Sequence, residues 1–118
     1  MASGSNDLST KWLRGLLEAC VLGILRSGPA YGYDIAGRIE HAGIARPQGG
    51  TLYPILARLE SDGLVEPSWI EGQGGPSRKY YALTARGVAA ADDITAQWAA
   101  FSHGVSTLIA GQTHRSAS

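Results

Sequence analysis

Three basic side chains lie in one stretch of the sequence that contains no acid. Residues 72–86 include Arg78, Lys79 and Arg86, whereas the preceding residues 60–71 hold four acids. Neutralising the phosphates of a nucleic acid requires clustered lysine and arginine side chains. The net charge of the chain is zero, so any basic surface must come from this segregation of charge. We expect a local nucleic-acid contact around Arg78 and Lys79.

A second group of polar side chains lies on one side of a predicted helix that follows Gly49 and Gly50. Apolar residues recur there at i, i+3, i+4 and i+7, namely Leu52, Ile55, Leu56 and Leu59. Burying this stripe leaves Thr51, Tyr53 and Arg58 pointing outward, where hydroxyl and guanidinium groups reach base edges and phosphates. The two glycines let the start of the helix approach a phosphate backbone closely.

Each of these side chains also has a simpler interpretation. Arg58 on an exposed helix face is, by itself, more often a solvated charge, and Tyr53 more often packs its ring than contacts a base. Tyr31 and Tyr33, which we also assign to the DNA-binding set, are equally suited to anchoring a helix in the core. The DNA-binding interpretation rests on all of them falling on elements that one DNA-binding architecture uses.

The sequence argues against an enzyme and predicts neither a metal site nor a cofactor. His41, His103 and His114 are far apart, and no cysteine or carboxylate lies near them at ligand spacing. Asp92 and Asp93 form an acidic pair, but adjacent positions of a helix do not face one another. Catalysis is therefore the function class that the residues favour least.

Periodicity predicts the elements that hold these groups. A first helix with apolar pairs every four residues ends at Gly28 and Pro29, and Ser9 or Thr10 is placed to cap its start. A second helix runs from about Tyr31 to His41. The third, containing the Leu52 stripe, ends at Gly63, and Pro54 must lie near its first turn.

After the third helix the composition changes to β-branched and aromatic residues. The segments Leu64–Ile70 and Lys79–Thr84 flank a glycine-rich turn, which predicts a two-stranded hairpin. Thr84 then caps a final helix that reaches to about Ile109, with Asp92 and Asp93 lying toward its positive end.

The order helix, helix, helix, hairpin predicts a mostly α fold with a two-stranded β wing, the winged helix-turn-helix. We place this DNA-binding domain at residues 9–84 and a C-terminal dimerisation helix at 85–110. Residues 1–8 and 111–118 are small and polar, and we expect disordered tails there.

The final helix carries the pattern of a coiled-coil interface. Apolar residues follow spacings of 3, 4, 3, 4 and 3, namely Ala91, Ile94, Trp98, Phe101, Val105 and Leu108. We expect this stripe to meet a second copy of the chain, with Leu16 of the first helix packing on the partner's last helix. The alternative is a core helix that folds back on its own domain.

The sequence predicts neither a membrane span nor a secretory signal. No apolar stretch is long enough to span a membrane, and the first residues do not resemble a secretory signal. We expect a cytoplasmic protein that does not contact the membrane.

Several separated motifs resemble the PadR family of bacterial transcriptional regulators. They agree in order and spacing from about Leu13 to Ile109, and they read YGYDI at 31–35, GTLYPIL at 50–56, RLE at 58–60, DGL at 62–64 and RKYYALT at 78–84. The single C-terminal helix is similar to that of the smaller PadR subfamily.

The resemblance implies a homodimeric repressor that binds a palindromic operator and releases it when a small ligand arrives. Trp98 falls where a multidrug-binding relative has an interfacial tryptophan, which implies a planar aromatic effector held by Trp98, Phe101 and Leu13. The alternative is that Trp98 only fills the dimer interface, because aromatic side chains are common there without a ligand.

The predicted wing differs from many DNA-binding wings because it has fewer basic residues. Glu66 and Glu71 flank it, so binding should be modest and strongly salt-dependent. The rival interpretation is a winged helix that senses a ligand or binds a protein without contacting DNA. The side chains of Arg58, Arg78 and Lys79 distinguish the two.

Overall fold

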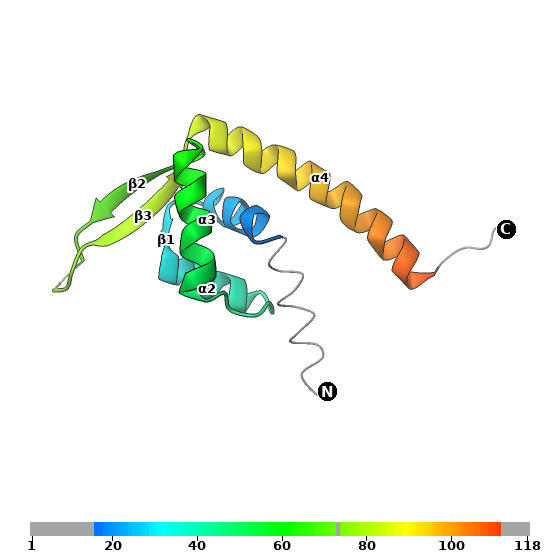
Figure 1. Cartoon of the computed structure of the whole chain (residues 1–118), viewed down its shortest axis with the longest axis horizontal. Helices are drawn as coiled ribbons and strands as arrows, with labels where there is room; N and C mark the ends of the chain where they lie inside the picture. Colours follow the sequence, from blue (N-terminus) through cyan, green and yellow to red (C-terminus); the bar gives the residue numbers. More distant parts are fainter. Residues whose placement is uncertain (1–15, 73, 112–118) are drawn as a thin grey trace.

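The computed structural model describes residues 16–72 and 74–111 of the chain. A first helix occupies 16–25, and the later elements are β1 Ala30–Tyr31, α2 Gly32–His41, α3 Gly49–Ser61, β2 Val65–Ile70, β3 Arg78–Leu83 and α4 Ala85–Ala110 (Figure 1). The predicted winged helix-turn-helix with a long terminal helix is confirmed. The expected caps at Ser9 and Thr10 and both expected tails, except Gly111, lie outside the described residues.

The sheet has three antiparallel strands in the order β1-β3-β2, one strand more than the sequence pattern predicts. The hairpin register runs from Val65 opposite Leu83 to Ile70 opposite Arg78. β1 adds the pair Tyr31 and Tyr80 on the other edge of β3. Our prediction that the second helix begins at Tyr31 is therefore wrong by one residue, because Tyr31 ends this short strand.

The core is formed by side chains from every layer of the domain. Leu17 and Val21 of the first helix, Ile35 of α2 and Leu56 of α3 are fully buried. Val65 and Tyr81 of the wing close the same cluster from the sheet side. Burial of each large apolar side chain stabilises the fold by roughly 1.5–3 kcal/mol, so this cluster fixes the orientation of α3.

Helix α3 begins earlier than its apolar stripe suggested. Gly49 and Gly50 form its first two residues rather than preceding it, and Pro54 lies in the second turn rather than near the first. Proline has no N–H, so the helix lacks one internal hydrogen bond to the Gly50 carbonyl. Both glycines are exposed, and the Tyr53 ring lies beside Gly49.

Thr84 joins the wing to α4, as the sequence predicts for an N-cap. Its side chain accepts a hydrogen bond from the Gly87 N–H at 3.0 Å and donates one to the Gly63 carbonyl at 2.7 Å. The first turn of α4 contains no acid, so the expected interaction of Asp92 and Asp93 with its dipole is wrong. Their distance from the helix start explains this, because the dipole effect fades within one turn.

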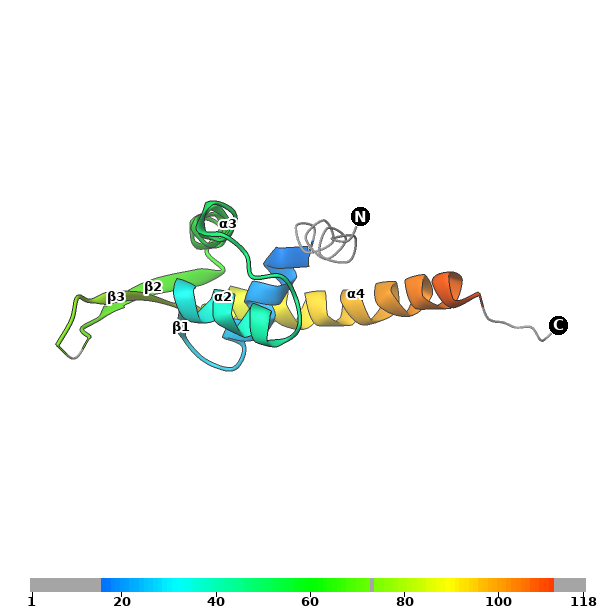
Figure 2. The same cartoon turned by 90° about the horizontal axis from the view of Figure 1, so that it is seen from below.

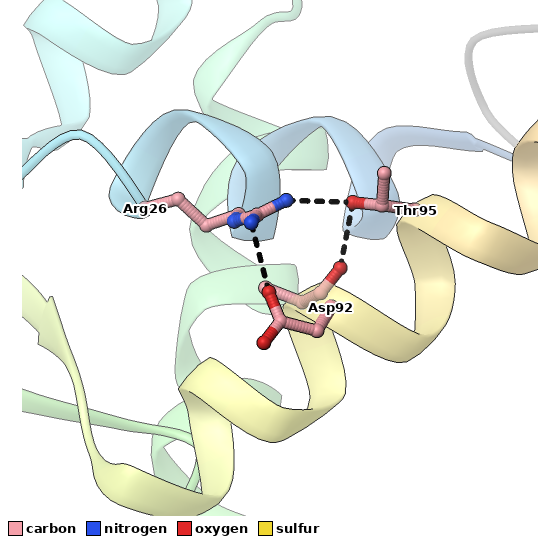
Figure 3. Close-up of polar contacts among 4 residues, drawn as sticks. Arg26, Asp92 and Thr95 are labelled. Carbon is pink, nitrogen blue, oxygen red and sulfur yellow. Dashed lines mark hydrogen bonds and ion pairs between the residues drawn. The ribbon is translucent and has the colours of Figure 1, made fainter.

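Polar contacts hold the N-terminal half of α4 against the end of the first helix. Arg26 forms an ion pair of 2.8 Å with Asp92 and donates a hydrogen bond of 3.0 Å to the Thr95 hydroxyl. The Thr95 hydroxyl in turn donates to the Ala91 carbonyl, and Figure 3 shows Arg26 reaching both Asp92 and Thr95. These contacts set the direction in which α4 leaves the domain.

Beyond these contacts α4 projects away from the rest of the molecule (Figures 1 and 2). Ala91 is fully buried in the core of its own domain, and Ile94 packs against that core. Ala91 therefore has no exposed surface to offer a partner, whereas Ile94 is only partly buried. No helix among residues 16–72 and 74–111 has both the length and the apolarity that crossing a membrane requires.

Candidate nucleic-acid interface

The outward face of α3 carries the three side chains predicted from its periodicity. Thr51, Tyr53 and Arg58 are all exposed, and Tyr53 retains half of its surface. The Tyr53 ring also packs closely on the backbone of α2, because a Cβ at Gly32 would lie 2.6 Å from its Cε1 atom. Tyr53 therefore combines the two alternatives, since its ring is packed against a glycine while part of it faces solvent.

The start of α3 presents backbone donors beside these side chains. The first N–H groups that donate into the helix belong to Thr51 and Leu52, and both bond to the Gln48 carbonyl at 2.9 Å. The N–H groups of Gly49 and Gly50 precede these bonds, and both glycines are exposed. Such a helix start favours an anion electrostatically.

The wing holds its two basic residues in different surroundings. The Arg78 guanidinium lies 4.9 Å from the centre of the Tyr31 ring and donates to the Tyr31 hydroxyl at 3.4 Å. The Lys79 ammonium lies 3.3 Å from a Glu60 carboxylate oxygen. The hydrogen bond to Glu60 raises the pKa of Lys79, and the nearby Tyr81 contributes in the same direction.

Arg58 is also paired with an acid. Its Nη2 lies 3.1 Å from a carboxylate oxygen of Glu18 in the first helix, and both side chains remain well exposed. An exposed pair of this kind is weak and is screened by salt. An incoming phosphate group can therefore bind the charged groups of Arg58 and Lys79 if it displaces their carboxylate partners, Glu18 and Glu60.

Sequence reasoning missed Arg46, which lies in the segment leading into α3. Its guanidinium sits 4.7 Å from the centre of the Tyr33 ring, donates to the Glu40 carboxylate at 3.1 Å and donates to the Tyr33 carbonyl at 3.3 Å. Arg46, Tyr33, Tyr53 and Gly49 line one pocket of about 420 Å³. The available signal was a basic residue placed just before the glycines that open the third helix.

The residues predicted to contact a partner chain or an effector differ in how exposed they are. Trp98 and Phe101 contact each other with ring centres 6.1 Å apart, and they are 44% and 63% exposed. Leu108 is exposed, whereas Val105 and Leu16 are partly buried. Leu13 lies outside the described residues.

The aromatic pair of α4 is thus separate from the polar surface of α3 and the wing. Within residues 16–72 and 74–111, no three acidic, histidine or cysteine side chains are grouped as metal ligands require. The site is a surface of exposed hydroxyls, arginines and a lysine, carried by a helix and an adjacent hairpin. Such a surface is suited to contacting phosphates and base edges.

Residues 21–93 match the family described as the transcriptional regulator PadR-like family. The chain belongs to this family. A PadR family regulator from Eggerthella lenta is 36% identical in sequence, with 92% of this chain and 97% of that chain covered and a TM-score of 0.73. A PadR-like regulator from Bacillus cereus is 30% identical over 86% of this chain and 99% of that chain, with a TM-score of 0.77.

A curated relative from Lysinibacillus sphaericus, described as an uncharacterized protein, is 29% identical over 89 residues. That match covers 74% of this chain and 82% of the relative. PadR-like proteins are transcriptional regulators and not enzymes, so this chain is a DNA-binding regulator. The family therefore favours the DNA-binding interpretation over a winged helix that has lost contact with DNA.

Proposed function

We propose that this PadR-like regulator is a homodimeric repressor that binds a palindromic operator in the cytoplasm. The observation that carries the proposal is the placement of Thr51, Tyr53 and Arg58 on the exposed face of α3, next to a wing whose Lys79 pairs with Glu60 of the same helix. In this architecture the third helix enters the major groove and the wing contacts the neighbouring backbone or groove.

The side chains divide the work of recognition by their chemistry. Thr51 and Tyr53, near the start of α3, read base edges, because the N-terminal residues of a recognition helix contact bases. Arg58, Arg78 and Lys79 contact phosphates, which position the protein but carry little sequence information. The backbone N–H groups of Gly49 and Gly50, at the N-terminus of α3, add a further phosphate contact.

Dimer formation is supported by the apolar side chains that α4 leaves uncovered. Trp98, Phe101 and Leu108 are substantially exposed in the single chain. The 26 residues of α4 extend for about 39 Å, long enough to pair with a second copy well away from the core. A two-fold dimer would place its α3 helices in successive major grooves, which is the reason for expecting a palindromic site.

The aromatic pair of α4 is the proposed site of a ligand response. The exposed Trp98 and Phe101 rings would stack on a planar aromatic effector at the dimer interface, with Leu13 as a third contact. Binding there would change the distance between the α3 helices and release the operator. The alternative is that both rings only fill the interface.

The test is a fluorescence titration of labelled duplex from the DNA upstream of the gene, at two salt concentrations. Wild-type protein should bind, and the affinity should fall steeply with salt. Replacing Arg78 and Lys79 together by alanine should weaken binding to all duplexes and flatten the salt dependence. Equal affinities of wild type and double variant would remove the wing from the mechanism.

The matched control is Arg38→Ala, which removes an exposed arginine of α2. Arg38 lies five positions along α2 from Tyr33, about 140° around the helix. It should leave both the affinity and its salt dependence close to wild type. For the effector, planar aromatic compounds that leave the Trp98 fluorescence and the operator affinity unchanged would contradict the ligand response.

A further inference from the structure

Two arginines and two tyrosines form a continuous stack across the surface between the wing and the start of α3. The Arg78 guanidinium lies 4.9 Å from the centre of the Tyr31 ring. The Tyr31 and Tyr33 rings are stacked, with centres 6.5 Å apart and an interplanar angle of 16°. The Arg46 guanidinium covers the Tyr33 ring at 4.7 Å.

The stack joins parts of the chain that are distant in sequence. Arg78 begins β3, Tyr31 ends β1, Tyr33 lies in the first turn of α2, and Arg46 lies between α2 and α3. Pairing of β1 with β3 places Tyr31 opposite Tyr80, whose ring packs against it at 5.1 Å. The two missed features of the sequence, β1 and Arg46, thus belong to the same arrangement.

Both ends of the stack can donate hydrogen bonds to an anion. A guanidinium has five N–H donors, and the hydrogen bonds described for Arg46 involve only its Nη1 and Nη2 atoms. The Arg78 side chain is exposed, and among the described residues its hydrogen bond goes to the neutral Tyr31 hydroxyl. The face of an aromatic ring attracts a cation within about 6 Å without neutralising its charge.

Tyr33 is 70% exposed although its ring makes two stacking contacts. A large exposed aromatic ring that holds an arginine is poorly explained by packing of the core. It is well explained by presenting the Arg46 guanidinium to a partner. Tyr33 would then limit the freedom of a long side chain that otherwise loses conformational entropy on binding.

We infer that this stack extends the DNA contact from Arg78 of the wing to Arg46 beside the start of α3, and that both guanidinium groups bind the sugar-phosphate backbone. Tyr33 and Tyr31 are positioning residues that hold the two guanidinium groups. The inference rests on the proposed function, since it needs a duplex docked on α3. The two ends of the stack bind phosphates, so it adds affinity for duplex DNA of any sequence.

The ion pair of Arg46 with Glu40 is compatible with this role. Its Nη1 to Oε1 distance is 3.1 Å, and the Glu40 side chain is 59% exposed. Exposed pairs of this kind exchange partners at little free-energy cost, because water solvates both separated ions. A phosphate group can therefore replace Glu40 at the Arg46 guanidinium.

The experiment measures the salt dependence of binding for Arg46→Ala, with Arg38→Ala as the control for loss of an exposed arginine. Loss of one phosphate contact should lower the slope of log affinity against log salt by about 0.9. The wild-type to variant affinity ratio should then shrink about 3.5-fold between 50 and 200 mM salt. Arg46→Ala should weaken an operator duplex and an unrelated duplex by the same factor.

Variants at Tyr33 distinguish a positioning role from a structural one. Tyr33→Phe keeps the ring face and should bind as wild type does, whereas Tyr33→Leu should lose most of the affinity that Arg46→Ala loses. Combining Tyr33→Leu with Arg46→Ala should cause no further loss, because the two changes remove one contact. Thermal denaturation of each variant checks that the fold is retained.

Three results would overturn the inference, and they are distinguishable. If wild type binds duplex but Arg46→Ala keeps the wild-type slope, the stack contributes no phosphate contact while the proposed function stands. If Tyr33→Leu binds as wild type does while Arg46→Ala is weakened, Tyr33 has no positioning role. Absence of binding by wild type would overturn the inference together with the proposed function.

Discussion

A substitution of Thr84 should weaken the connection between α4 and the winged domain more clearly than any other. Its hydroxyl accepts from the Gly87 N–H at 3.0 Å, which caps the start of α4. The same hydroxyl donates to the Gly63 carbonyl at 2.7 Å, at the turn that ends α3. Replacing Thr84 by alanine removes both hydrogen bonds and leaves the partly buried Gly63 carbonyl without this donor.

The expected cost follows from these two contacts. Losing an N-cap side chain costs about 0.5–2 kcal/mol, and losing an ordinary hydrogen bond costs about 0.5–1.5 kcal/mol. The sum is about 1–3.5 kcal/mol of unfolding free energy. For a chain of this size each kcal/mol lowers the melting temperature by about 4 °C, so the decrease should be about 4–14 °C.

The assay is thermal unfolding followed by circular dichroism at one fixed protein concentration, because the melting temperature of a dimer depends on concentration. The control is Thr107→Ala, the same substitution in the same helix. The Thr107 hydroxyl donates only to the His103 carbonyl within α4, at 2.9 Å, and the residue is exposed. Its change should stay within about 0.5 kcal/mol. Equal melting temperatures for the two variants would refute the role given to Thr84.

Four further predictions follow from individual residues. Gly87→Ala should destabilise the fold by about 1–3 kcal/mol in the same melt, because the added Cβ would collide with the Leu64 carbonyl oxygen; an unchanged melt would contradict that packing. Glu60→Gln should tighten DNA binding by freeing Lys79, and weaker binding would contradict this. The pKa of Lys79 in the folded protein is raised above its ordinary value of 10.5. The pair with Glu60 therefore stabilises the fold fully below pH 10.5, and this contribution is lost only as the pH rises through the higher folded pKa. Through this pair, stability should not change between pH 7 and 9. Burial raises the pKa of the half-buried Cys20 thiol, so a thiol reagent should modify it far more slowly in folded than in denatured protein, and equal rates would contradict this.

The main elements are predictable from the sequence because each has its own strong local pattern. The stripe of α3 and the Thr84 cap depend on residues within one or two turns, and the hairpin on two runs of strand-forming residues. Periodicity could not locate the start of α3, since Gly49 and Gly50 have no side chains to bury. The two-residue strand β1 is equally invisible, because it exists only through pairing with β3.

In the candidate site, too, local patterns predict some features, whereas contacts between distant elements determine others. The outward direction of Thr51, Tyr53 and Arg58 follows from the buried stripe, and the structure agrees. The pairing of Arg58 with Glu18 and of Lys79 with Glu60 joins separate elements, so spacing along the chain does not reveal it. The structure likewise places Ala91 in the core of its own domain, because a heptad pattern does not distinguish a partner from a neighbouring helix.

The most direct test of the account is the mass of the complex formed with DNA. Sedimentation equilibrium of the protein with a duplex of about 30 base pairs, long enough for two half-sites and taken from the upstream DNA, measures how many chains bind. The account predicts a dimer in free solution and two chains on each duplex. A stable single chain in solution, or one chain on each duplex, would contradict it.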